Sequence, residues 1–336
     1  MKVAVIGAGS WGTTIASLAA QNADVVLWAR RADLADRINW DHQNPDYLDG
    51  FALPERLVAT ADIAQALAGA DIVVVGVPSH VYRSVLEQAV GLVDPSTPIL
   101  SLTKGIEENS RLRMTEVTLE VLSDHDPGAV GVLSGPNLAR EIMQGQPAAT
   151  VIAMGDHDVA RRLQPIFMTS TFRVYTNPDV VGAEVAGAVK NVMAIAAGAA
   201  TGLGFGTNSL ATLITRALVE IARLGVAMGG QPLTFGGLAG VGDLMATCLS
   251  PLSRNNRVGV ELGQGRRLNE IVADMNMVAE GVKTTRGVLQ LAESYEIDMP
   301  IVDQVGRILY EDATPRDALA RLMGRAPKAE GYGIVL

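Results

Sequence analysis

Short runs of apolar, mostly β-branched residues recur through the first half of the chain, and each run ends in a small or polar loop. They lie at residues 3–6, 25–28, 72–75, 99–102, 130–133, 149–153 and 172–175. Near-continuous apolar runs are typical of parallel strands that are covered on both faces. Helix-like segments, such as residues 13–21, lie between them. This alternation predicts an α/β domain with a doubly wound, mostly parallel sheet over residues 1–177.

Helical periodicity replaces this pattern after Asn177-Pro178. The predicted helices, which Gly and Pro residues separate, occupy residues 180–200, 210–228, 238–248, 258–263, 268–275, 283–295 and 300–310. The first of them lies in a weakly polar stretch that is rich in Ala and Gly and is interrupted by the charged residues Glu184 and Lys190. We therefore expect a buried helix rather than a membrane span. Residues 178–336 are therefore predicted to form an all-α domain.

The first apolar run leads directly into the sequence GAGSWG at residues 7–12. A G-x-G-x-x-G turn between a strand and a helix is the fingerprint of a Rossmann-type dinucleotide-binding domain. Gly7 would permit the tight turn, Gly9 would let backbone amides approach a pyrophosphate, and Gly12 would let the helix pack closely on the sheet. A helix N-terminus also attracts anions. We therefore predict a nicotinamide dinucleotide here; the alternative is a purely structural glycine turn.

Arg30 and Arg31 follow the second apolar run, where the adenosine ribose of such a cofactor is expected. Sites that prefer NAD usually place an acid there to accept hydrogen bonds from the ribose hydroxyls. Two arginines suit a 2′-phosphate instead. The sequence thus predicts NADPH as the preferred cofactor, with NADH possible. The alternative is that one or both arginines are solvated loop charges.

Composition and charge narrow the choice of partners. The chain has 336 residues, enough for two domains, and a formal net charge of −9, which argues against nucleic acid or an anionic membrane as a partner. The single cysteine, Cys248, excludes an internal disulfide framework. None of the four histidines has metal-ligand spacing, so we expect no metal. We also expect a cytoplasmic protein without membrane insertion.

Polar residues of the helical half offer candidate chemistry. Lys190 lies among Ala, Val and Met residues, so it needs a partner or a lowered pKa, and either suits a general base. The alternative is a lysine that reaches water or pairs with Glu184. Asp243 could orient a lysine, accept from a substrate hydroxyl or cap a helix. The hydroxyl, guanidinium and amide groups of residues 253–255 suit a phosphate dianion.

Six motifs in this order resemble the bacterial NAD(P)-dependent sn-glycerol-3-phosphate dehydrogenases. They are residues 7–12 (GAGSWG), 101–107 (SLTKGIE), 134–136 (SGP), 189–191 (VKN), 240–244 (GVGDL) and 250–255 (SPLSRN). The resemblance covers residues 1 to about 320. It implies reversible hydride transfer between the cofactor and dihydroxyacetone phosphate, a small phosphorylated triose. The product, sn-glycerol 3-phosphate, would supply glycerophospholipid synthesis.

The resemblance also implies roles for individual residues. Lys190 resembles the family's proton acceptor in alcohol oxidation and its donor in ketone reduction, and Lys104 resembles the residue that touches both nicotinamide and substrate. Lys104, Lys190 and Asp243 are thus the candidate catalytic residues. Positions that match further substrate contacts are Gly135, Asn137, Asp243, Ser253, Arg254 and Asn255. Positions that match cofactor contacts are Ser10, Trp11, Arg30, Arg31, Lys104, Ala139, Arg254, Val278 and Glu280.

The chain departs from the family pattern at two positions. Asn137 stands where the family usually has Ser or Thr, and Asn256 replaces a residue that is often more basic. An amide can still donate and accept hydrogen bonds, so the phosphate site is expected to persist.

Two other functions stay open. One is another two-domain reductase of the hydroxyacid or ketopantoate type, and the other is an NADP-sensing protein without turnover. The Ala-rich helices favour a homodimer.

Overall fold

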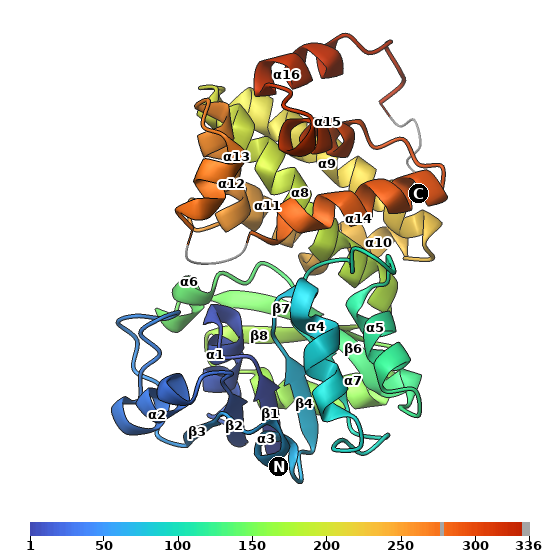
Figure 1. Ribbon diagram of the computed structural model, residues 1–336. Coiled ribbons are helices and arrows are strands. Elements are labelled where there is room, and N and C mark those ends of the chain that lie inside the picture. Colours follow the sequence, from blue (N-terminus) through green and yellow to red (C-terminus); the bar gives the residue numbers. More distant parts are fainter. Residues whose placement is uncertain (276–278, 331–336) are drawn as a thin grey trace. The chain divides into compact units, whose positions relative to one another are not determined.

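Eight strands form a single sheet in the N-terminal part of the chain (Figure 1). The computed structural model describes residues 1–275 and 279–330. The strand order is β3-β2-β1-β4-β5-β6-β7-β8, and only the β6–β7 pair is antiparallel among the described strands. The strands are β1 (Lys2–Ile6), β2 (Asp24–Trp28), β3 (Leu57–Thr60), β4 (Ile72–Val75), β5 (Ile99–Ser101), β6 (Val130–Ser134), β7 (Ala148–Met154) and β8 (Phe172–Asn177). The predicted doubly wound, mostly parallel sheet is confirmed.

The order of the strands reverses between β1 and β4, the place where open α/β sheets usually bind ligands. Helices flank the sheet; for example, α1 packs against β1 and α7 packs against β8. These helices are α1 (Ser10–Ala19), α2 (Ala32–Asp41), α3 (Ile63–Leu67), α4 (Ser79–Leu86), α5 (Met114–Val121), α6 (Ala139–Met143) and α7 (His157–Phe167), with 3₁₀ turns at Glu87–Ala89 and Pro127–Ala129.

The chain divides into two compact units. The sheet unit comprises Met1–Thr103 and Met114–Val180, and the helical unit comprises Lys104–Arg113 and the chain from Val181 onward. The sequence pattern places residues 104–113 in the first domain, but this segment belongs with the helices. Ile106 is 4% exposed within the apolar core of the helical unit, and Arg111 donates to Ser294 Oγ at 3.1 Å.

The helical unit agrees with the predicted all-α domain. Its elements are α8 (Val180–Gly202), α9 (Thr207–Ala227), α10 (Pro232–Phe235), a π-helical turn (Leu238–Gly242), α11 (Asp243–Leu249), α12 (Arg254–Gly263), α13 (Leu268–Ala273), α14 (Glu280–Ser294), α15 (Pro300–Tyr310) and α16 (Pro315–Met323). Residues 238–248, predicted as one helix, are a π turn followed by α11. That turn makes Asp243 the first residue of a new helix.

Close backbone packing joins α8 to α12. A Cβ atom on Gly198 of α8 would lie 2.0 Å from Asn256 O, and one on Gly259 of α12 would lie 2.1 Å from Ile195 O. Only glycine fits at such contacts. The packing therefore fixes the start of α12 beside the helix that carries Lys190.

Two helical stretches, Val180–Gly202 and Pro232–Leu249, have the length and apolar content of a membrane span. In the first, 83% of the apolar window is buried in the structure, and in the second 44% is. The first is thus a core helix, as its Ala and Gly content predicts.

Candidate active site

The turn after β1 has the backbone geometry that the glycine spacing predicts. Gly7 has a φ of +120°, which residues with a side chain rarely adopt, and a Cβ there would lie 2.7 Å from Gly76 O. A Cβ on Gly12 would lie 2.0 Å from Gly7 O. A Cβ on Gly9, in contrast, would meet no described atom within 4 Å. Gly7 and Gly12 are thus required by the fold itself, whereas Gly9 leaves open space.

This open space fits a pyrophosphate. Gly9 is the N-cap of α1, and among the described residues no side chain caps this helix and no acid lies in its first turn. The first amides of α1 can therefore donate to an anion. In the described part of the chain, the buried indole Nε1 of Trp11 also has no hydrogen-bond partner. Ser10 Oγ donates to Tyr47 O at 2.8 Å.

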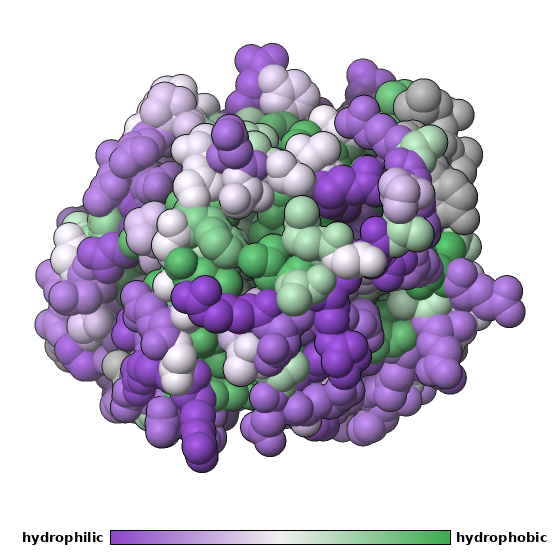
Figure 2. All heavy atoms as spheres, turned by 90° about the horizontal axis from the view of Figure 1, so that it is seen from above, coloured by the Kyte–Doolittle hydropathy of each residue, from purple (hydrophilic) through white to green (hydrophobic). Residues whose placement is uncertain are grey.

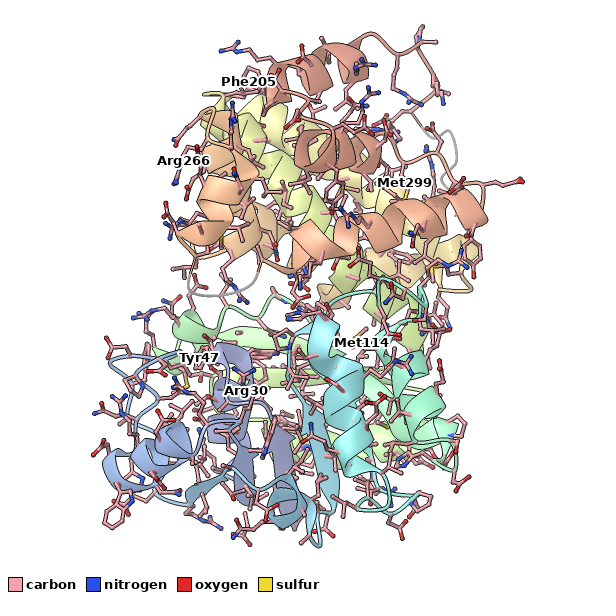
Figure 3. All side chains as sticks on the ribbon, viewed as in Figure 1. Arg30, Tyr47, Met114, Phe205, Arg266 and Met299 are labelled. Carbon is pink, nitrogen blue, oxygen red and sulfur yellow. The ribbon has the colours of Figure 1, made fainter. Side chains whose placement is uncertain are left out.

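The two arginines after β2 are exposed, and Arg31 has acidic neighbours. Its guanidinium contacts Asp46, and its Nε lies 3.7 Å from Asp33 Oδ1. Figure 3 labels Arg30 and Tyr47, which belong to the two segments that this contact joins. Arg31 is thus an ion-paired residue rather than an isolated solvated charge.

The loop after β6 carries three more of the candidate residues. Gly135 has a φ of +153°, and a Cβ there would lie 3.1 Å from Thr150 Cα. Asn137 Nδ2 donates to Thr150 Oγ1 at 2.9 Å, while its buried Oδ1 has no partner among the described residues. Asn137 therefore keeps an acceptor available at the position where the family usually has a hydroxyl. Ala139 follows as the first residue of α6.

In the helical unit, one carboxylate binds two lysines. Lys190 Nζ lies 2.6 Å from Asp243 Oδ1, and Lys104 Nζ lies 2.6 Å from Asp243 Oδ2. The side chains of Asp243 and Lys190 are 2% and 7% exposed, and that of Lys104 is 17% exposed. Asp243 thus pairs with both lysines, and the N-cap of α11 is Gly242 rather than Asp243.

The surroundings of Lys190 lower the pKa of its amine. Burial lowers its pKa to about 8, Lys104 acts in the same direction, and Asp243 opposes both. An amine with such a pKa can give or take a proton near neutral pH. Burial also raises the pKa of the neighbouring Cys248 thiol to about 12, so this cysteine is not a nucleophile.

Lys190 forms an ion pair with Asp243, whereas Glu184, its alternative partner from the sequence, forms one with Arg113. Glu184 Oε2 lies 2.6 Å from Arg113 Nη1, and both side chains are largely buried. Arg113 ends the segment Lys104–Arg113. This ion pair therefore helps to hold the segment that carries Lys104 on α8.

Two residues of this cluster are not predicted from the sequence as site residues. Thr247 Oγ1 accepts from Lys190 Nζ at 2.5 Å and donates to Asp243 O at 2.7 Å. Asn191 Nδ2 donates to Lys104 O at 3.3 Å. Thr247 lies four residues after Asp243 on one helix face, which is the spacing that could have found it. Asn191 was visible only as part of the VKN motif.

The candidate phosphate residues lie at the start of α12. Ser253 is the N-cap, and its Oγ accepts from Asn256 N at 3.3 Å; Arg254 follows as the first helical residue. Asn255 Nδ2 donates to Asn191 Oδ1 at 3.0 Å, which links α12 to the lysine cluster. Asn256 is buried and donates to Cys248 O at 2.8 Å.

Of the last two candidates, only Glu280 lies among the described residues. Glu280 is the first residue of α14, and its charge attracts the Arg254 guanidinium. Val278 lies outside the described residues. Among the residues that are described, no group of three His, Cys, Asp or Glu side chains could hold a metal ion.

Both halves of the chain match models of one protein family. The model described as NAD-dependent glycerol-3-phosphate dehydrogenase N-terminus matches residues 2–160, and the corresponding C-terminus model matches residues 179–320. A Sphingopyxis alaskensis protein named glycerol-3-phosphate dehydrogenase (NAD(P)+) 2 is 54% identical over 323 residues, which are 96% of each chain. The chain belongs to the NAD-dependent glycerol-3-phosphate dehydrogenase family.

Other relatives support this membership over the full length. A Thermobifida fusca glycerol-3-phosphate dehydrogenase (NAD(P)+) is 49% identical over 337 residues, with 99% of each chain covered. The crystal structure of a Coxiella burnetii glycerol-3-phosphate dehydrogenase is 37% identical and has a TM-score of 0.91, with 96% of this chain and 99% of that chain covered. The family assignment therefore includes both the sheet unit and the helical unit.

Proposed function

We propose that this chain reduces dihydroxyacetone phosphate to sn-glycerol 3-phosphate in a reversible, nicotinamide-dependent reaction. The observation that carries the proposal is the pair of lysines on Asp243, within a chain that matches the dehydrogenase family in both halves. The product would supply glycerophospholipid synthesis.

The proposed chemistry divides between the cofactor and the protein. The reduced nicotinamide, when bound, supplies a hydride to the central carbonyl carbon. Lys190 gives its proton to the carbonyl oxygen, which becomes the hydroxyl, and takes this proton back in alcohol oxidation. Lys104 stabilises the negative charge that develops on that oxygen. Asp243 holds both ammonium groups, and Thr247 accepts a hydrogen bond from Lys190.

The pKa of Lys190 gives the reaction a direction-dependent response to pH. Ketone reduction needs the protonated amine, so its rate should fall as the pH rises through about 8. Alcohol oxidation needs the neutral amine, so its rate should rise over the same interval.

Two groups of residues are proposed to bind the substrate. Arg254, together with Ser253 and Asn255 at the start of α12, is proposed to bind the phosphate. Gly135 and Asn137 are proposed as further substrate contacts. Phosphate binding far from the reacting carbon would align that carbon for hydride transfer.

For the cofactor, the glycine turn with Ser10 and Trp11 is proposed to bind the pyrophosphate region, and Ala139, Arg254 and Glu280 to make further contacts. Val278, at a matching position, belongs to the same proposal.

NADPH is proposed as the preferred cofactor, with NADH accepted, because Arg30 and Arg31 suit a 2′-phosphate. Michaelis constants for both cofactors in wild type and Arg30→Asp test this preference. The variant should lose affinity for NADPH and keep that for NADH; an unchanged preference would refute the assignment.

A substrate panel tests the proposed activity against its rivals. The absorbance of reduced nicotinamide should fall when the protein is mixed with NADPH and dihydroxyacetone phosphate, and should stay constant with ketopantoate. Turnover of ketopantoate alone would favour the other two-domain reductase. Cofactor binding without turnover of either substrate would favour an NADP-sensing protein.

The protein is proposed to act in the cytoplasm as a homodimer. Figure 2 shows one face of the molecule, on which polar residues surround an apolar area. Two apolar side chains of the helical unit, Leu233 and Leu249, are 90% and 53% exposed. Apolar surface of this kind is typical of protein contacts. Sedimentation at equilibrium should give twice the mass of the chain, and the mass of one chain would exclude the dimer.

A further inference from the structure

A loop after α2 brings a carboxylate to Arg31 of the proposed cofactor site. The guanidinium of Arg31 contacts Asp46 Oδ2, and Arg37 Nη1 lies 3.7 Å from Asp46 Oδ1. The Asp46 side chain is 33% exposed, and that of Arg31 is 47% exposed. Asp46 thus lies between two arginines and remains accessible from solvent.

Hydrogen bonds on both sides of Asp46 fix this loop. Asn44 is fully buried, and its Nδ2 donates to Ala8 O at 2.9 Å and to Thr13 Oγ1 at 2.8 Å. Tyr47 O accepts from Ser10 Oγ at 2.8 Å. Residues two positions before and one position after Asp46 are therefore bound to the glycine turn and α1. The carboxylate position follows from the fold of the sheet unit rather than from a freely moving side chain.

We propose that Asp46 is a specificity-determining residue, which disfavours NADPH by competing with the 2′-phosphate for Arg31. The inference rests on the proposed function, in which Arg31 receives that phosphate. A phosphate monoester carries about −1.5 to −2 charges at neutral pH, so a fixed carboxylate on its partner must be displaced or must repel it.

The same carboxylate suits NADH. Sites that prefer NAD place an acid near the adenosine ribose, where it accepts hydrogen bonds from the hydroxyls. In those sites the acid usually follows the second strand, whereas this chain has Arg30 and Arg31 there. Asp46 supplies the acid from a neighbouring loop instead. The pairing of Arg31 with Asp46 therefore allows both cofactors to be used.

Direct binding titrations test the proposal without turnover. Dissociation constants for NADPH and NADH are measured by the fluorescence of the bound nicotinamide in wild type and in Asp46→Asn. The variant should bind NADPH about three- to tenfold more tightly, from the removal of one charge at a partly exposed site. Its affinity for NADH should be unchanged or weaker. The gain for NADPH should shrink at high ionic strength.

Asp49→Asn is the matched control, because it removes the same charge from the same loop and Asp49 is exposed. It should leave the ratio of the two dissociation constants within about twofold of wild type, as expected for an exposed surface charge. In an Arg31→Ala background, Asp46→Asn should no longer improve NADPH binding, because the guanidinium for which Asp46 and the 2′-phosphate compete is absent. If Asp46→Asn fails to fold, Asp46→Ala provides the same comparison.

Three results would overturn the proposal: an unchanged ratio in Asp46→Asn, weaker NADPH binding in that variant, or an equal effect in the Arg31→Ala background. The proposed function fails separately, through absent turnover of dihydroxyacetone phosphate, which these titrations do not measure.

Discussion

The glycine turn of the sheet unit and the lysine cluster of the helical unit are built in opposite ways. The turn uses backbone groups from six consecutive residues, and its geometry depends on missing Cβ atoms. The cluster uses charged side chains, with Lys104 and Lys190 lying 139 and 53 positions from Asp243. A backbone site does not titrate, whereas the cluster does. Cofactor binding by the turn and turnover by the cluster should therefore separate under mutation and pH.

Replacing Lys190 should give the largest effect. Lys190→Ala removes the proposed proton donor, so kcat for dihydroxyacetone phosphate reduction should fall by about 10²- to 10⁴-fold. The dissociation constant for NADPH should stay within about twofold, because the glycine turn is untouched. Lys283→Ala is the matched control, since Lys283 is an exposed lysine of α14. Near-normal turnover in Lys190→Ala would remove the lysine from the mechanism.

Asp243→Asn tests how the cluster is held. The change leaves two ammonium groups without their shared carboxylate, and it removes the charge that raises the pKa of Lys190. We expect kcat to fall about ten- to a hundredfold and the pKa of Lys190 to drop below about 8. The pH profile of the oxidation rate measures this shift. An unshifted profile would show that Asp243 does not set the protonation of Lys190.

Two glycine variants test the other side of the comparison. In Gly9→Ala the added Cβ meets no described atom within 4 Å, so the melting temperature without cofactor should not change. The added Cβ would, however, occupy the proposed pyrophosphate space, and the dissociation constant for NADPH should rise about tenfold or more.

Gly12→Ala is the contrasting variant, because its Cβ would lie 2.0 Å from Gly7 O. It should destabilise the protein by about 1 to 3 kcal/mol even without cofactor. Thermal denaturation of both variants checks the contrast. Equal melting temperatures would mean that the two glycines are not used differently.

The contrast also explains what the sequence could predict. The turn was recognisable because its signal lies in consecutive residues, and most strands were found because their runs are almost entirely apolar and buried. β3 was missed because it is a four-residue strand at the edge of the sheet, with Val58 52% exposed. α16 was missed although Thr314 and Asp317 form a capping box at its start, a signal that apolar periodicity does not include.

The cluster could be predicted only in part. Lys190 was predicted as a site residue because it is a charge in an apolar helix. Its partner depends on which helices pack together, and Glu184 lies nearer to it in the sequence than Asp243 does. The position of Asp243 follows from the π turn Leu238–Gly242, which residue periodicity does not distinguish from a helix. Segment 104–113 packs with the helical unit because of ion pairs between residues far apart in the sequence, such as that of Arg113 with Glu184. Such pairs cannot be recognised from the local sequence pattern.

The central claim is that a single buried amine moves the proton in both directions of the reaction, and the most direct test is kcat against pH, measured for reduction and for oxidation. Because the pKa of Lys190 is lowered to about 8, the rate of reduction should fall as the pH rises through about 8, and the rate of oxidation should rise over the same interval. Profiles that change in the same direction would contradict the account, as would profiles that stay flat between pH values of about 7 and 9.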